Sequence, residues 1–174
     1  MPTRQRHEWR SDDGVFCACM TVEVLEKIMH ACHARATVET GGILIGRYGR
    51  THSCAIVTDV SMPPPDSTHS STCFQRGVHG LQQWLDQLWR SDGHYYLGEW
   101  HYHPAGSPYP SQIDIEQMRA IARDVDYQCP EPLLLVVGGH TARSLPITLF
   151  LCSSGDSWWE LVSTQGWHGI TGNR

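Results

Sequence analysis

The chain has no long apolar run and no cluster of basic residues. No segment approaches the roughly 18 apolar residues that a membrane-spanning helix needs, and the first residues are too polar for the apolar centre of a signal peptide. Lys and Arg are scattered singly and the net charge is −5, which gives no electrostatic footprint for nucleic acid or anionic lipid. We therefore expect a cytoplasmic protein with no nucleic acid and no membrane as partner.

The cysteines include no CxxC pair, and their number, 7, is odd. In a chain without a secretion signal they are expected to be reduced thiols. Cys32, Cys54 and Cys152 lie in apolar patterns and are expected to be small core residues. The pair Cys17 and Cys19 could bind a metal, but no second pair stands at zinc-finger spacing, so no finger is predicted.

Length and composition predict one globular domain. The 174 residues are 40% hydrophobic and 18% charged, and a chain of this size seldom divides into two domains. The sequence shows no repeat and no second domain, so residues 1–174 are predicted to form a single unit.

Apolar periodicity predicts a mixed sheet with helices packed against it. Apolar residues at helical spacing predict helices over 21–35 and 78–89, and a third that begins at Ser111 and places Val125 on its apolar side. Short apolar or β-branched runs predict strands over 42–48, 53–61, 95–102, 133–137 and 147–151, the first two antiparallel. The proline-rich segment 62–72 is predicted to be an exposed loop. The tail after Ser153 is polar except for Trp158, Trp159 and Trp167, and it could pack on the body or contact a partner.

The stretch HYHPAGSPYPSQID carries a candidate metal site. Residues i and i+2 of a strand point to the same face, so His101 and His103 present two imidazoles side by side. Imidazole is a common zinc ligand, and a hydrolytic zinc keeps one of its four positions open. Asp114 is a candidate third ligand because the intervening loop is long enough to fold back to the strand end. Trp100 is expected to face away from the metal and to pack in the core.

Ser111 and Asp114 also have a purely structural interpretation. An N-cap serine followed by an acid three residues later is a capping-box pattern, here with Asp in place of Glu. The two roles are compatible, since a capped aspartate is held rigidly, as a metal ligand must be.

The spacing His101-x-His103, seven residues, Ser111, two residues, Asp114 resembles the signature of the JAMM metallopeptidases, also called JAB or MPN-plus domains. Glu39, in ETGGILIG, stands where that family has an upstream glutamate, although alone it could be a solvated charge at a turn. The resemblance covers about residues 20–151. It implies an α/β fold: a single JAB/MPN domain whose mixed, curved β-sheet is flanked by helices, with a cytidine-deaminase-like architecture.

The resemblance also implies residue roles. His101, His103 and Asp114 would bind one Zn²⁺, with water in the fourth position. Glu39 would take a proton from that water, and Ser111 would donate a hydrogen bond to the oxyanion of the tetrahedral intermediate. Segments 62–72 and 104–110 would build a groove for the substrate.

The short chain with GEWHYHP before the ligands resembles bacterial JAMM proteases found beside E1- and E2-like enzymes. This implies an isopeptidase that cleaves after the C-terminal glycine of a ubiquitin-like protein, or of a conjugated cyclase in antiphage defence. Two alternatives stay open: a processing peptidase for a ubiquitin-like or sulfur-carrier precursor, and a catalytically inactive MPN interaction module. The zinc deaminases are excluded because the chain lacks their HxE and PCxxC segments.

Overall fold

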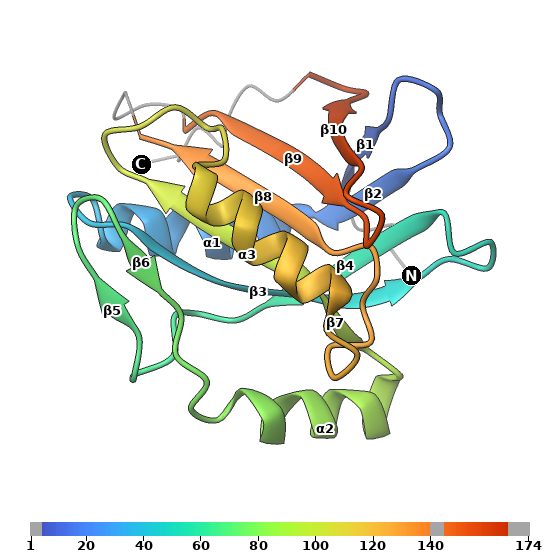
Figure 1. Ribbon diagram of the computed structural model, residues 1–174, viewed down its shortest axis with the longest axis horizontal. Helices are drawn as coiled ribbons and strands as arrows, with labels where there is room; N and C mark the ends of the chain where they lie inside the picture. Colours follow the sequence, from blue (N-terminus) through green and yellow to red (C-terminus); the bar gives the residue numbers. More distant parts are fainter. Residues whose placement is uncertain (1–4, 140–144, 167–174) are drawn as a thin grey trace.

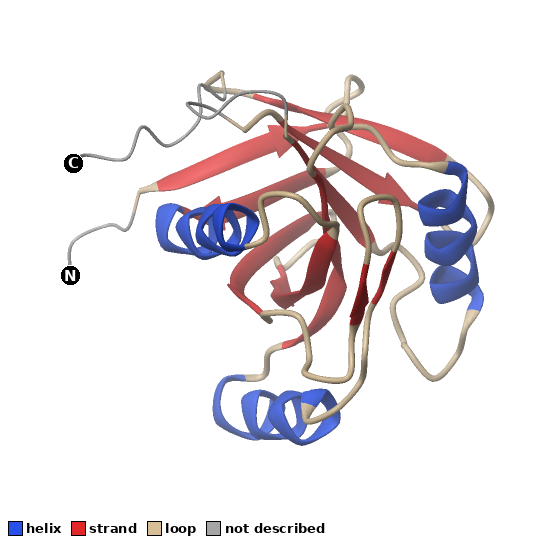
Figure 2. Cartoon of the chain, turned by 90° about the vertical axis from the view of Figure 1, so that its left-hand side faces the viewer, coloured by secondary structure: helices blue, strands red, loops and turns tan. Residues whose placement is uncertain are grey.

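Among the described residues, eight strands close into a barrel, and helices pack against it (Figures 1 and 2). The computed structural model describes residues 5–139 and 145–166. The barrel order is β1-β10-β9-β8-β7-β3-β4-β2, and a separate two-stranded hairpin pairs β5 with β6. The mixed helix and strand content is as predicted; the predicted curved sheet takes the form of a closed barrel.

The bounds of the elements are as follows. The strands are β1 Arg6–Arg10, β2 Cys17–Thr21, β3 Thr40–Tyr48, β4 Cys54–Val60, β5 Thr68–His69, β6 Phe74–Gln75, β7 Tyr95–His103, β8 Leu133–Gly138, β9 Ile147–Cys152 and β10 Trp158–Ser163; the helices are α1 Val22–Ala34, α2 Leu81–Asp92 and α3 Gln112–Arg123. All predicted helices and strands are present within a few residues, and β3 and β4 are antiparallel as expected.

The strands that close the barrel were not predicted. β1 joins β2 to β10, and β2 runs parallel to β4. The described part of the tail, which ends at residue 166, therefore packs on the body: Trp158 and Trp159 lie in β10, half-buried against the two apolar clusters of the protein. Trp167 falls outside the described residues. These strands are only five or six residues long and carry polar side chains, so they give little periodic signal.

Two residues that were predicted to lie on the apolar side of a helix are exposed instead. Val78 is 68% exposed, because α2 begins only after Gly80, whose φ of 78° lies in the left-handed region and serves as the N-cap. Val125 is 82% exposed, because α3 ends at Arg123 and Asp124 is its C-cap.

The expectation that all cysteines are reduced is also wrong. The parallel pairing of β2 with β4 places Cys17 opposite Cys54, and the two form a disulfide with a Cα–Cα distance of 4.4 Å. Cys54 is therefore a bonded, partly exposed residue and not a core thiol. Cys32 and Cys152 are buried thiols, as predicted.

A bulge in β7 decides which of its side chains face α3. Leu44 pairs with Gly98 and Ile45 with Tyr96, which leaves Leu97 as an extra residue. Gly98 has a φ of 149°, and a Cβ there would meet the backbone of Leu133, so only glycine fits. Beyond the bulge, Trp100 and Tyr102 join Leu97 in the cluster inside the barrel.

Glu99, His101 and His103 consequently point to the other side of β7, toward α3. Trp100 is fully buried and its Nε1–H donates to the carbonyl of Ser61 at 3.0 Å, which confirms that it faces away from the histidines. The bulge therefore sets the direction of the candidate metal ligands.

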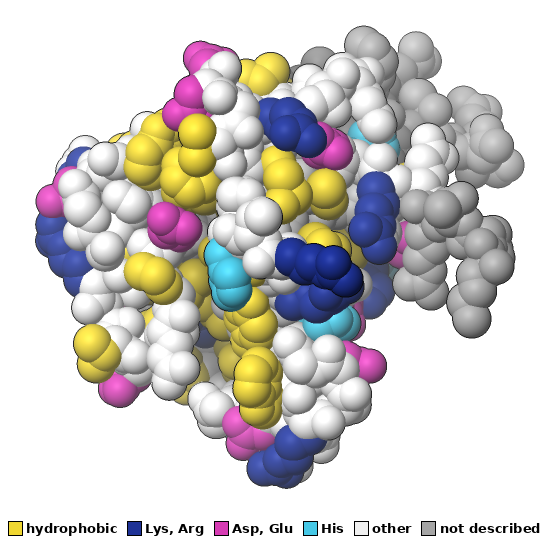
Figure 3. Space-filling view, turned by 90° about the vertical axis from the view of Figure 1, so that its right-hand side faces the viewer, with side chains coloured by type: hydrophobic (Ala, Val, Ile, Leu, Met, Phe, Trp, Pro, Cys, Tyr) yellow, Lys and Arg dark blue, Asp and Glu magenta, His cyan; other side chains and the backbone are white. Residues whose placement is uncertain are grey.

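The helix α2 stands partly away from the barrel. Only Leu81 of this helix is buried, and Trp89 is 61% exposed. A groove of about 880 Å³ runs between α2 and the start of β7. Figure 3 views the molecule from this end and shows hydrophobic side chains gathered over it. The groove lies at the opposite end of β7 from His101 and His103, which are not part of its lining. No helix among the described residues is long and apolar enough to cross a membrane.

Candidate metal centre

Two strands and one helix start bring the candidate ligands together. His101 and His103 lie at the end of β7, and β3 runs antiparallel beside them with Gly41 opposite His101. The same register places Glu39, just before β3, across from His103. Gly41 is needed here, because a Cβ would lie 3.0 Å from Cδ2 of the His101 ring and still closer to neighbouring atoms.

Asp114 is held in place by the first turn of α3. The Ser111 hydroxyl accepts a hydrogen bond from the backbone N–H of Asp114, while Oδ2 of Asp114 accepts from the backbone N–H of Ser111 at 2.7 Å. The predicted capping box is thus present. The hydroxyl of Ser111 also lies 2.7 Å from Oδ2 of Asp114. These contacts fix the carboxylate against the two histidines.

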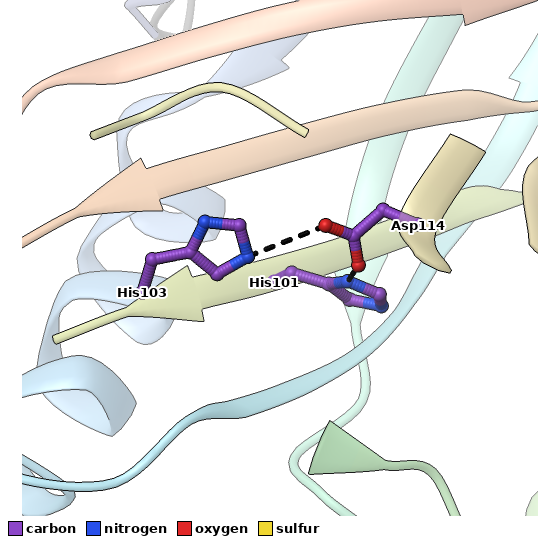
Figure 4. Close-up of side chains that lie close together, drawn as sticks. All are labelled: His101, His103 and Asp114. Carbon is purple, nitrogen blue, oxygen red and sulfur yellow. Dashed lines mark hydrogen bonds and ion pairs between the residues drawn. The ribbon is translucent and has the colours of Figure 1, made fainter. Parts of the chain in front are cut away.

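His101, His103 and Asp114 converge on one point (Figure 4). Nδ1 of His101 lies 2.7 Å from Oδ1 of Asp114, and Nε2 of His103 lies 3.4 Å from Oδ2. Each residue offers one ligand atom, and the three atoms all lie within 4.8 Å of one another. This is the one such group of His, Cys, Asp and Glu side chains found in residues 5–139 and 145–166.

The donor set fits a metal ion. Two imidazoles and one carboxylate are a common ligand set for first-row transition metals, and they leave further positions open. Nε2 of His101 is buried and has no hydrogen-bond partner, which is costly unless something else satisfies the nitrogen. Nδ1 of the same ring is taken by Asp114, so Nε2 is the nitrogen of His101 that is free to bind a cation.

Asp114 and His103 shift each other's pKa in opposite directions. Burial by itself would raise the pKa of Asp114, but hydrogen bonds from His101 and His103 outweigh it and hold that pKa well below its usual range. The hydrogen bond to Asp114 raises the pKa of His103, against the opposing effect of burial. Asp114 is therefore an anion that attracts positive charge, as a metal ligand should be.

The pKa of Glu39 is raised, whereas that of Asp114 is lowered. Glu39 is half-buried, and burial raises its pKa, with smaller effects from the charges of His103, Asp114 and His101. A carboxylate whose pKa moves toward neutrality is a better proton acceptor at physiological pH. The structure thus brings Glu39 beside the three candidate ligands, in an environment suited to a general base.

Three further residues near the site were missed by the sequence analysis. His69, Phe74 and Arg76 lie on or next to the β5–β6 hairpin, and they contact Glu39, His101 and Glu99 respectively. The proline-rich segment 62–72 was predicted to be a loop, and two-residue strands give no readable alternation. The one available signal was the length of that segment, since long loops in compact domains often serve a site.

The fold and the site together identify the class of protein. Residues 21–149 match the family of prokaryotic homologs of the JAB domain, and the chain belongs to this family. A protein of Desulfitobacterium hafniense, whose solution structure is known, is similar in fold, with a TM-score of 0.59 and 23% identity over 81% of this chain and 87% of the other.

More specific similarity comes from curated relatives. A CD-NTase/cGAS isopeptidase of Enterobacter hormaechei is 39% identical over 84% of this chain and 81% of its own length. A CD-NTase/cGAS isopeptidase of Vibrio cholerae is 38% identical over 66% of this chain and 74% of its own. A probable metalloprotease of Sinorhizobium fredii is 27% identical over 71% of this chain and 76% of its own. The family and the last relative point to a metal ion, in agreement with the His-His-Asp group.

Proposed function

We propose that this chain is a zinc-dependent isopeptidase that releases a CD-NTase-type cyclase conjugated to other molecules through its C-terminus. The observation that carries the proposal is the convergence of His101, His103 and Asp114 beside the half-buried Glu39. The names of the relatives support the substrate class. Formation of the conjugate by E1- and E2-like enzymes belongs to the same proposal.

His101, His103 and Asp114 would hold the zinc ion. When bound, zinc polarises a carbonyl and lowers the pKa of water to about 7. Glu39 accepts the proton of the attacking water and delivers it to the departing amine of the isopeptide bond, which leaves as a neutral amine. Ser111 lies beside the carboxylate ligand and donates a hydrogen bond to the oxyanion that forms at the attacked carbonyl.

To donate to an oxyanion, the hydroxyl of Ser111 must give up its hydrogen bond to Asp114. This hydroxyl lies 2.7 Å from Oδ2 of Asp114, and the backbone N–H of Ser111 donates to the same oxygen. When the hydroxyl turns toward an oxyanion, the backbone N–H still holds Asp114. The hydroxyl of Ser111 can therefore donate to the substrate while Asp114 keeps its position.

Ser111→Gly is expected to separate catalysis from helix capping. Glycine at an N-cap costs only a few tenths of a kcal/mol relative to serine, whereas loss of an oxyanion donor lowers kcat by roughly 10²- to 10³-fold. Thermal unfolding measures the cost in stability, and steady-state cleavage measures the loss of kcat. A variant with wild-type kcat would show that the hydroxyl of Ser111 serves the helix alone.

The proposed function is tested with two substrates. The first is a cyclase joined through its C-terminal carboxyl to a lysine side chain of a reporter, and the second is a linear fusion of the same pair. We expect cleavage of the isopeptide-linked substrate, loss of cleavage with a chelator, and recovery when Zn²⁺ is resupplied. His103→Ala is the matched control and should lose both metal, by elemental analysis, and activity.

Other outcomes point elsewhere. Cleavage of the linear fusion alone would indicate a processing peptidase. No cleavage of either substrate by metal-loaded protein would indicate an interaction module. Purified protein that takes up no transition metal would contradict the metal site itself.

A further inference from the structure

The β5–β6 hairpin holds both backbone groups of Glu39. The N–H of Glu39 donates to the carbonyl of Ser70 at 2.7 Å. Nδ1 of His69 lies 2.9 Å from the carbonyl oxygen of Glu39. A carbonyl only accepts, so Nδ1 of His69 carries the proton and donates it. Figure 1 shows this hairpin set apart from the barrel strands, at the left of the view.

Among the described residues, no barrel strand pairs with Glu39. The pairing of β3 with β7 begins at Thr40, and its pairing with β4 begins only at Leu44. The first residues of β3 therefore meet the hairpin where β4 would otherwise lie. Glu39 stands just outside the barrel ladder, and its backbone direction depends on His69 and Ser70.

The hairpin is itself fixed against the site. The ring of Phe74 meets the ring of His101 edge-on, with centroids 5.9 Å apart, and lies 5.1 Å from the ring of His69. A Cβ on Gly41 would come within 2.7 Å of Phe74. Phe74 thus packs closely on β3 and on a candidate ligand, which holds His69 where it can reach Glu39.

The hairpin is also anchored at its far end. Nε of Arg76, which follows β6, donates to both carboxylate oxygens of Glu99 at 2.9 and 3.1 Å. The Glu99 side chain is fully buried and that of Arg76 is 8% exposed. Glu99 stands two residues before His101 on the same strand. Hairpin and ligand strand therefore form one connected support for the site.

We propose that His69 is a positioning residue for Glu39: its Nδ1–H hydrogen bond fixes the Glu39 backbone, and thereby aims the carboxylate at the attacking water. This rests on the proposed function, in which Glu39 is the general base. A base that is displaced by a fraction of an ångström loses proton-transfer geometry without changing how substrate binds. The effect of His69 should therefore fall on kcat.

An isosteric pair of variants tests the hydrogen bond. Asn places an amide N–H close to the position of Nδ1, and Leu has the same shape without a donor. We expect His69→Leu to lower kcat by about 10- to 100-fold with KM changed less than about threefold. His69→Asn should recover most of the loss, and both should bind as much metal as the wild type. His79→Leu, at an exposed histidine just beyond the hairpin, is the matched control and should be neutral.

A second readout is independent of activity. The amide of Glu39 donates to Ser70, so its hydrogen exchange reports how firmly the hairpin holds it. Exchange at Glu39 should be about tenfold faster in His69→Leu, the effect of losing one hydrogen bond, and close to wild type in His69→Asn.

The outcomes separate the two proposals. Wild-type kcat in His69→Leu, or an equal loss in Leu and Asn, would overturn the positioning role and leave the proposed function intact. If the wild type cleaves nothing, the proposed function fails, and amide exchange then tests the His69 contact: unchanged exchange in His69→Leu would show that the contact does not hold Glu39.

If His69→Leu does not fold, His69→Asn tests the positioning role by itself, and a loss of kcat in that variant counts against the proposal.

Discussion

Replacing Glu39 with Gln is expected to lower kcat by about 10²- to 10⁴-fold while the protein keeps its metal. Glutamine has the shape of glutamate and can still accept a hydrogen bond, but it cannot take up a proton. The metal should stay because His101, His103 and Asp114 form the ligand group without Glu39. Glu39→Ala should likewise keep metal and lose turnover.

The measurement pairs elemental analysis with steady-state cleavage of the isopeptide-linked substrate. Glu26→Gln, at an exposed position of α1, removes the same charge far from the chemistry and is expected to be neutral. A Glu39→Gln protein that turns over at the wild-type rate would refute the base assignment. One that loses its metal would instead make Glu39 a ligand.

The candidate ligands could be predicted from the sequence because they lie on short segments with strong local patterns. His101 and His103 share one face of a strand at any register, and Ser111 with Asp114 forms a helix cap that depends on four residues only. The side of β7 on which the histidines lie could not be read with the same ease. It depends on the bulge at Gly98, and only the glycine inside a strand pattern hinted at it.

What the sequence did not reveal depends on contacts between distant segments. Cys17 meets Cys54 only because β2 pairs with β4, and neither the short β2 nor the closure of the barrel has a local signal. His69 reaches Glu39 across 30 residues of chain for the same reason. Long-range pairing of short strands is set by the packed whole, so periodicity along the chain does not predict it.

The buried ion pair between Arg76 and Glu99 predicts a large effect on stability. Arg76→Met is expected to lower the free energy of unfolding by about 3–5 kcal/mol, because it leaves the Glu99 carboxylate buried without its cation. The hydroxyl of Tyr96, which donates to Oε1 of Glu99 at 3.1 Å, is too weak a partner to compensate. Chemical denaturation followed by tryptophan fluorescence measures the loss.

Two controls separate the lost cation from lost packing. Arg123→Met removes an arginine from an exposed pair with Asp156 and should cost at most about 1 kcal/mol. The double variant Arg76→Met/Glu99→Leu removes both charges and should regain most of the stability, since a buried ion pair is often no better than an apolar pair of similar volume. If the double variant is as unstable as Arg76→Met, packing by the arginine stem holds the hairpin to β7. If Arg76→Met costs no more than Arg123→Met, the pair does not anchor the hairpin, and Glu39 must owe its position to the contacts of His69, Ser70 and Phe74 alone.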